Sequence, residues 1–173
     1  MKLTNESPIR TALLNEDDIG KVIRTHTHIE SLINSYICKA VNRPDYIKKL
    51  KLDYFGCVNL ALCLGLSEDL QKPLHAIGTI RNEFAHKTNQ KIDKNRVDNF
   101  FDTFSPSQKS NLMKAIQGTS WIKWGNATNE EKFTALCLAL YYKCEGEVLR
   151  IECEVQSNAL SKILTKRHMD EDI

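Results

Sequence analysis

Residues 75–86 carry side chains whose types and spacing suit chemistry at a phosphate. Asn82 and His86 are four residues apart, so they are neighbours on a helix, and His75 falls on the same polar flank. A histidine with a near-neutral pKa transfers protons, and an arginine such as Arg81 stabilises negative charge that develops on a phosphate. These groups suffice to cleave RNA without a metal, by activating a 2′-hydroxyl against its own phosphate. The competing interpretation is that Asn82 and His86 cap the end of their helix.

Arg81 falls inside the apolar stripe of the same segment. At about 100° per residue, it lies about 20° from Leu70 on the helix. The stripe consists of Leu70, Leu74, Ile77, Ile80, Phe84 and Ala85. An unpaired charge in such a stripe is costly, and the same projection places Glu30, with His26 beside it, in the middle of the stripe of an earlier helix. We therefore predict that Arg81 and Glu30 meet between the two helices or across a dimer seam, as a structural salt bridge or as part of a reactive site.

Helical periodicity dominates the sequence, and no run of alternating apolar and polar residues is long enough to predict a strand. The predicted fold class is all-α, with a single compact bundle of about six to eight helices. Of the 173 residues, 42% are hydrophobic, which is enough for one sizeable core. We expect an N-terminal arm over residues 1–14, one helical domain over 15–165 and a C-terminal tail over 166–173.

Capping signals divide the first half of this domain into helices. Asn15 is the expected cap of a helix over 16–41, which Pro44 then terminates. The segment "YFGCVNLALCLGL" is apolar on nearly every side, so it predicts a buried central helix that ends at Gly65. The helix that carries the phosphate-directed residues is expected from about Asp69 to His86, where a polar connection begins.

The second half of the domain has equally clear signals. A helix is predicted over 94–103, and Ser105, followed by Pro106 and then Gln108, predicts the capped start of the next one. A capping box at Thr128 opens a long helix over about 128–150. This helix is apolar on most sides, which predicts burial between its neighbours or against a second copy of the chain.

Composition excludes several classes of function. With 24 Lys and Arg against 22 Asp and Glu, the net charge is only +2, so nucleic-acid binding would need a local patch. No run approaches the ~18 apolar residues of a membrane span, and a cytoplasmic location without membrane contact is expected. The six cysteines lack zinc-site spacing and are expected to be reduced core thiols. His26 and His28 point in different directions on a helix, so neither a metal nor another cofactor is predicted.

The spacing Arg81-Asn82-x-x-x-His86 resembles the R-N-x-x-x-H form of the motif of HEPN domains (higher eukaryotes and prokaryotes nucleotide-binding). A longer stretch, from "LDYFGCVNLALCLGLSEDL" through "IGTIRNEFAHKTNQKID", is also similar to the helical mannitol-operon-repressor (MltR-like) family. The HEPN resemblance implies a homodimer in which the two motif helices face each other. One cleft would then hold two sets of Arg81, Asn82 and His86.

Two functions from different classes follow. In the first, the protein binds RNA as a metal-independent endoribonuclease of the toxin or phage-defence kind, with a neutralising or regulatory protein partner. His86 is then the general acid or base, Arg81 stabilises the phosphate and Asn82 positions it. In the second, the protein is an MltR-like transcriptional regulator or interaction protein without catalysis. The residues expected to guide RNA are Lys87, Lys91 and Lys94, and the supporting residues are Glu30, His26 and His75.

Overall fold

The computed structural model describes the backbone of residues 8–86 and 90–171, and the side chains of residues 9–86 and 90–161. Its elements in chain order are α1 (Pro8–Leu14), α2 (Asp18–Ala40), the 3-10 helix η1 (Pro44–Leu50), α3 (Tyr54–Cys63), η2 (Glu68–Leu70), α4 (Gln71–His86), α5 (Lys94–Asp102), α6 (Pro106–Gln117), η3 (Trp124–Asn126) and α7 (Asn129–Glu171). Every regular element in these ranges is helical, which confirms the predicted all-α fold.

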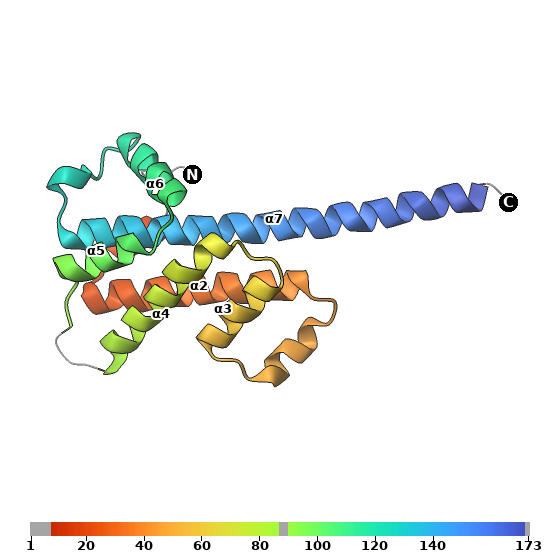
Figure 1. Cartoon of the computed structure of the whole chain (residues 1–173), viewed down its shortest axis with the longest axis horizontal. Helices are drawn as coiled ribbons and strands as arrows, with labels where there is room; N and C mark the ends of the chain where they lie inside the picture. The colour runs from red at the N-terminus through yellow and green to blue at the C-terminus, as the bar shows by residue number, and fades with distance from the viewer. Residues whose placement is uncertain (1–7, 87–89, 172–173) are drawn as a thin grey trace.

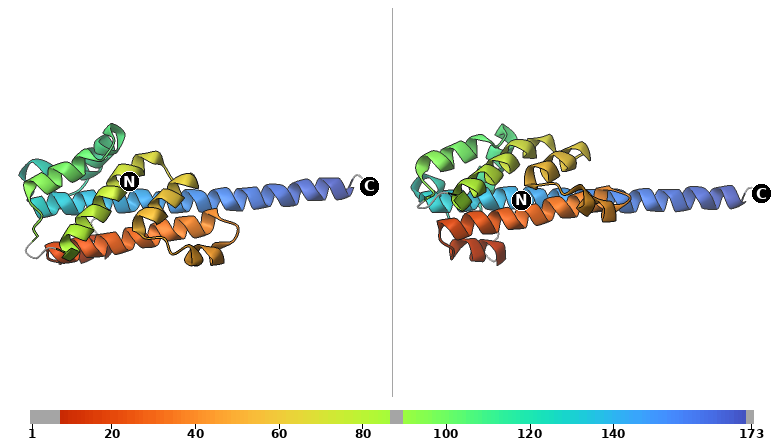
Figure 2. Two further views of the ribbon diagram at one scale, coloured as in Figure 1. Left: turned by 60° about the horizontal axis from the view of Figure 1, so that its bottom comes forward. Right: turned by 90° about the horizontal axis from the view of Figure 1, so that it is seen from below.

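The helices are arranged around α2 and α7, which lie side by side (Figure 1). Helices α3 and α4 pack against α2 and against each other, while α1 and α5 pack against α7. The second half of α7 extends beyond all the other helices, and the further views agree on this (Figure 2). Although α7 has 43 residues, no helix in the described part of the chain is both long enough and apolar enough to span a bilayer.

The central helix of the core is α7. Each residue from Phe133 to Leu140 is buried, because neighbouring helices of the same chain surround this stretch. The segment predicted to be central forms α3 instead, and its buried residues are Tyr54, Cys57, Val58 and Ala61. That prediction was wrong because α3 lies at the outside of α2 and α4, where one face meets solvent. The apolar composition of this segment predicted a helix correctly, but it did not predict how much of that helix is buried.

The start and end of the chain differ from the predicted boundaries. Residues 8–14, expected to belong to an arm, form α1, and its buried Leu13 belongs to the core. The cap of α2 is Asp17 rather than Asn15, since the Asp17 carboxylate accepts a hydrogen bond of 2.7 Å from the Gly20 amide. Helix α7 continues to Glu171, well past the predicted end near residue 150. By contrast, the capping boxes at Ser105 and Thr128 form as predicted.

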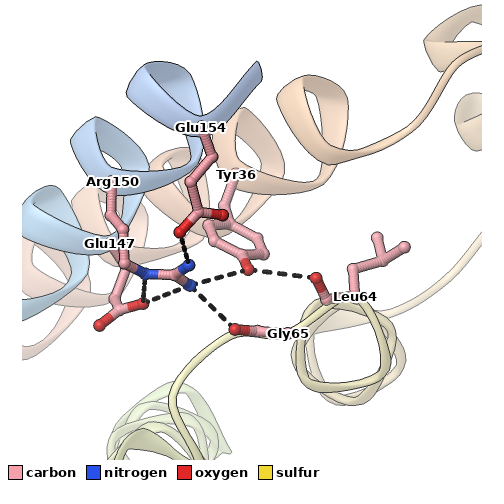
Figure 3. Close-up of polar contacts among 6 residues, drawn as sticks. All are labelled: Tyr36, Leu64, Gly65, Glu147, Arg150 and Glu154. Atoms are coloured by element: carbon pink, nitrogen blue, oxygen red, sulfur yellow. Dashed lines mark hydrogen bonds and ion pairs between the residues drawn. The ribbon is translucent and has the colours of Figure 1, made fainter. Parts of the chain in front are cut away.

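A polar network fixes the rotation of α7 at the point where it leaves the core. The Arg150 guanidinium donates to the Gly65 carbonyl over 2.9 Å and to the Tyr36 hydroxyl over 3.3 Å. It also pairs with Glu147 and Glu154 on its own helix, one turn before and one turn after it. Figure 3 shows how these side chains join α7 to α2 and to the turn after α3. Gly65 makes that turn with a φ of 95°, a conformation that favours glycine.

The cysteines form no disulfide, since all six are free thiols. The expectation of core thiols holds for three of them, Cys57, Cys137 and Cys144, and is wrong for the exposed Cys38, Cys63 and Cys153. Burial raises the pKa of both Cys137 and Cys144 to about 12. These two thiols are therefore protonated packing groups of the core and not nucleophiles.

Helix α4 takes its position from an unusually close approach to α3. The Tyr54 ring lies directly against Gly78, and its hydroxyl donates a buried hydrogen bond of 3.0 Å to the Leu74 carbonyl. A Cβ atom at position 78 would lie 2.6 Å from Tyr54 Cε1, a distance that a real Cβ does not adopt. Only glycine leaves room for the ring, so this contact sets the separation of the two helices.

We expect Gly78→Ala to lower the free energy of unfolding by about 1–3 kcal/mol, because the Tyr54 ring or one of the two helices must move. Urea unfolding followed by circular dichroism measures the change. Thr79→Ala, at the next and exposed position of α4, is the control and should change stability by less than about 0.5 kcal/mol. Equal stability of Gly78→Ala and the wild type would show that the two helices accommodate a methyl group at position 78 without cost.

Candidate functional site

The three motif residues lie along the last two turns of α4. Arg81 Nη1 donates a hydrogen bond of 3.0 Å to Asn82 Oδ1, and both residues are half-buried. His86 is exposed at the end of the helix, and its ring makes no hydrogen bond within the described ranges. The structure thus brings Arg81 and Asn82 together and leaves His86 accessible to solvent, one turn away from Asn82.

The predicted pair between Arg81 and Glu30 does not form within one chain. Both side chains are described, and no ion pair within 4.0 Å joins them. Glu30 lies instead 3.9 Å from Nδ1 of His26, one turn earlier on α2. Arg81 is only half-buried, so its charge is partly hydrated and the Asn82 amide suffices as its partner. A pair across a dimer seam remains a prediction.

His26 on α2 is a buried titratable group within electrostatic reach of Arg81. Its side chain is almost fully buried, with its ring 4.3 Å from the Tyr54 ring between centroids. Burial lowers the pKa of His26, because a charged imidazolium loses its hydration. The Glu30 carboxylate opposes this shift and the Arg81 guanidinium adds to it, which places both charges within electrostatic reach of the ring.

His75, predicted as a supporting residue, belongs to a different cluster from His86. It precedes His86 by about three turns of α4, or roughly 16 Å along the axis. Its ring packs edge-on against Phe55 at 5.4 Å, and Phe55 in turn packs against Tyr54 at 5.5 Å. Nε2 of His75 is buried and makes no hydrogen bond within the described part of the chain. The observed role of His75 is therefore packing between α3 and α4.

Arg96 is the site residue that the sequence analysis missed. From α5 it binds Glu83, inside the motif, with Nη1 to Oε2 at 2.5 Å, and its guanidinium lies 5.0 Å over the Phe84 ring. It also donates to Gln90 Oε1 and to the Lys91 carbonyl. The charge of Glu83 is thereby partly neutralised, which makes the motif less negative. No helical spacing relates Arg96 to Glu83, so no signal in the sequence pointed to this pair.

The lysines predicted to guide RNA differ in their surroundings. Lys87 lies outside the described residues. Lys94 forms an ion pair with Asp98 one turn later, and this hydrogen-bonded carboxylate raises the pKa of Lys94. Lys91 is exposed and makes no ion pair within the described residues. Of the two lysines that the structure describes, Lys91 is therefore the one whose charge has no partner among the described residues.

The described residues around the motif were searched for a group that could bind a metal ion. Among the described residues, no three histidine, cysteine or acidic side chains are grouped so that they could hold a metal ion. His26 is buried while His28 is exposed and faces the Tyr141 ring edge-on at 6.2 Å. The groups that can act here are one arginine, one amide and one exposed imidazole.

The chain was compared with protein-family models, with curated proteins and with solved structures, and nothing matched in any of the three comparisons. The geometry of the site therefore carries the functional argument.

The lowered pKa of His26 predicts a loss of stability in acid. Above the ordinary histidine pKa of 6.5, the ring is neutral in the folded and the unfolded chain alike. As the pH falls below 6.5, the unfolded chain takes up the proton first, so the free energy of unfolding decreases until the lower folded pKa is passed.

The urea midpoint should therefore be lower at about pH 5.5 than at about pH 7.5, and His26→Gln should reduce this difference. His28→Gln, at the exposed histidine of the same helix, serves as the control and should leave the difference unchanged. If His26→Gln keeps the full pH dependence of the wild type, another group must cause it.

Proposed function

We propose that this chain is a metal-independent endoribonuclease of the HEPN kind, active as a homodimer on RNA in the cytoplasm. One observation carries the proposal: an exposed histidine, a half-buried arginine and the amide that orients it lie together at the end of one helix. Arg81 keeps further N–H groups for a phosphate after its bond to Asn82. His86, with no partner within the described ranges, is accessible to a ribose hydroxyl.

The chemistry needs a base and an acid on opposite sides of a phosphate. His86 of one copy removes the proton from the 2′-hydroxyl, and the resulting oxygen attacks the adjacent phosphorus. The bond from phosphorus to the 5′-oxygen breaks, and that oxygen takes a proton from His86 of the second copy. Arg81 stabilises the additional negative charge on the phosphoryl oxygens, while Asn82 holds the guanidinium in place. The products are a 2′,3′-cyclic phosphate and a 5′-hydroxyl end.

Two exposed apolar residues of α2 support the dimeric arrangement. Ile19 and Ile23 on α2 are exposed large apolar residues, with exposed fractions of 48% and 36%. The steps from Ile19 through Ile23 and His26 to Glu30 are four, three and four residues. All four residues therefore lie along one face of α2. Large apolar side chains at such a rim are suited to contact with a second copy, which would also bring Glu30 close to the partner's Arg81.

The regulatory alternative is favoured by a different observation. Arg81 and Asn82 bond to each other within one chain, as expected where a motif only stabilises a fold. An MltR-like regulator or interaction protein would need no further chemistry from these residues. The same experiment decides between the two functions.

We expect the wild type to cleave RNA in excess EDTA, and His86→Ala and Arg81→Ala to reduce the rate at least about 100-fold. Asn82→Ala should reduce the cleavage rate less, by about tenfold, because Asn82 only positions Arg81. Product ends, analysed by phosphatase and kinase treatment, should carry the cyclic phosphate and the 5′-hydroxyl.

Two matched variants serve as controls, His28→Ala at an exposed histidine of α2 and Arg24→Ala at an exposed arginine paired with Glu16. Both should keep the wild-type rate, and each variant must retain its circular dichroism spectrum. Absence of cleavage by the wild type over a broad set of RNAs would reject the nuclease and favour the regulator.

A further inference from the structure

The connection between α2 and α3 concentrates positive charge on the surface of the molecule. Residues 43–52, called here the basic segment, carry four cations and one carboxylate and hence a net charge of +3, whereas the whole chain has a net charge of only +2. The rest of the chain is therefore slightly negative. The four cations are exposed, and they are Arg43, Lys48, Lys49 and Lys51.

The cations of the basic segment have no acidic partner within the described chain. None of the four forms an ion pair within 4.0 Å with another described residue. Elsewhere on the surface, cations such as Arg24, Lys39 and Lys109 are paired with carboxylates. The charges of the basic segment are therefore available to negative groups of another molecule.

Large apolar side chains are exposed among these cations. Tyr46, Leu50 and Leu52 have exposed fractions of 51%, 57% and 39%. The 3-10 helix η1 contains no buried residue, and only its half-buried Ile47 packs against the core. Exposed apolar groups that gather within one short segment are typical of a surface that contacts another molecule.

Tyr46 and two of the cations lie together on one side of η1. Arg43 Cζ is 4.9 Å and Lys49 Nζ is 4.4 Å from the centroid of the Tyr46 ring. A 3-10 helix has three residues per turn, so Tyr46 and Lys49 share a face that is distinct from the face of Ile47. Helix η1 packs against α2 and lies at the outer edge of the molecule, on the side of α2 and α3 away from α7 (Figure 1). A flat surface can reach it from that side.

We propose that the basic segment binds the surface of a membrane that contains anionic lipids. Its four cations lie at the level of the headgroups, whose phosphates and carboxylates supply the opposite charge. Leu50 and Leu52 enter the boundary between headgroups and acyl chains, and the Tyr46 ring lies at that boundary with its hydroxyl in water. Lysine and arginine stems are long enough to keep their charges among the headgroups while the apolar neighbours enter.

A bilayer accounts for more of the basic segment than a nucleic acid does. The phosphates of RNA would attract the same four cations. A base would have to stack on the Tyr46 ring, over which Arg43 and Lys49 already lie. Leu50 and Leu52 would remain in water. An anionic bilayer uses the charged and the apolar side chains together.

The attraction is sufficient for reversible binding at the membrane surface. A cation close to an anionic membrane raises the affinity roughly fivefold, so a net charge of three raises it roughly 100-fold. Partial burial of one exposed leucine adds about tenfold. Such contact is peripheral, since no helix in the described part of the chain could span a bilayer. The chain-wide charge of +2 predicted no membrane contact because it averages the basic segment with a slightly negative remainder.

The membrane surface goes beyond the proposed nuclease and does not depend on it. The motif on α4 lies beside the first half of α2, where Arg81 acts on the pKa of His26. The basic segment follows the other end of α2, and the stretch from His26 to Ala40 is about 21 Å long. Binding to vesicles is measured without RNA and without any residue of the motif.

Flotation of the full chain with lipid vesicles tests the charges. The wild type should bind vesicles of phosphatidylserine and phosphatidylcholine in equal parts at least about tenfold more tightly than phosphatidylcholine alone, and salt should weaken this binding. Lys48→Ala combined with Lys49→Ala should lower the affinity for the anionic vesicles about 25-fold. The matched control, Lys72→Ala combined with Lys123→Ala, removes two exposed lysines that have no ion pair within the described residues. It should lower the affinity by less than about twofold.

A second matched pair tests the apolar contact. Leu50→Ser should weaken binding to the anionic vesicles about tenfold, and Leu160→Ser, at a residue of α7 with an exposed fraction of 62%, should leave it unchanged. Each variant must retain its circular dichroism spectrum.

Four results would each overturn the proposal. The first is a wild type that binds both kinds of vesicle equally, and the second is an equal loss of binding in the two lysine variants. The third is a Leu50→Ser variant that binds as tightly as the wild type or no more weakly than Leu160→Ser. The fourth is a single-stranded RNA that displaces the wild type from vesicles and whose binding Lys48→Ala with Lys49→Ala abolishes, which would assign the segment to nucleic acid.

Discussion

The contact between Tyr54 and Gly78 is the constraint on which the candidate site depends. It lets α3 and α4 approach until the Tyr54 ring touches the α4 backbone, and the buried bond to the Leu74 carbonyl holds that ring in place. The same ring also contacts the ring of His26 on α2, with 4.3 Å between their centroids. Tyr54 thereby contacts both α2 and α4 from α3. The separation of these three helices determines where α4 places Arg81.

This packing leaves the two histidines near the site in different environments. His26 is buried beneath it with a lowered pKa, whereas His86 is exposed at the end of α4. Two charged groups act on His26 in opposite directions, and neither is buried deeply enough to need the other as a partner. The histidine that is accessible from solvent is thus His86, and His26 belongs to the scaffold.

Helix α7 combines two structural roles along one continuous element. Its first part, from Phe133 to Leu140, is buried on all sides and serves as the centre of the core. Its second part leaves the core past the Arg150 network and presents apolar residues to solvent. A helix that is apolar all round needs burial on every side, while one with a few apolar residues spread among polar ones can lie in solvent. The change between these patterns along α7 marks where the core of the chain ends.

The sequence by itself determined what depends on local chemistry. Helical periodicity predicted the all-α fold, and the Ser105 and Thr128 capping boxes formed as predicted, because their hydrogen bonds connect residues three apart. Only the tertiary structure decided which helix is central, that Arg81 contacts Asn82 and not Glu30 within one chain, and that Arg96 neutralises Glu83. These outcomes depend on the separation and rotation of helices, which side chains distant in sequence, such as Tyr54 and Gly78, set by contact.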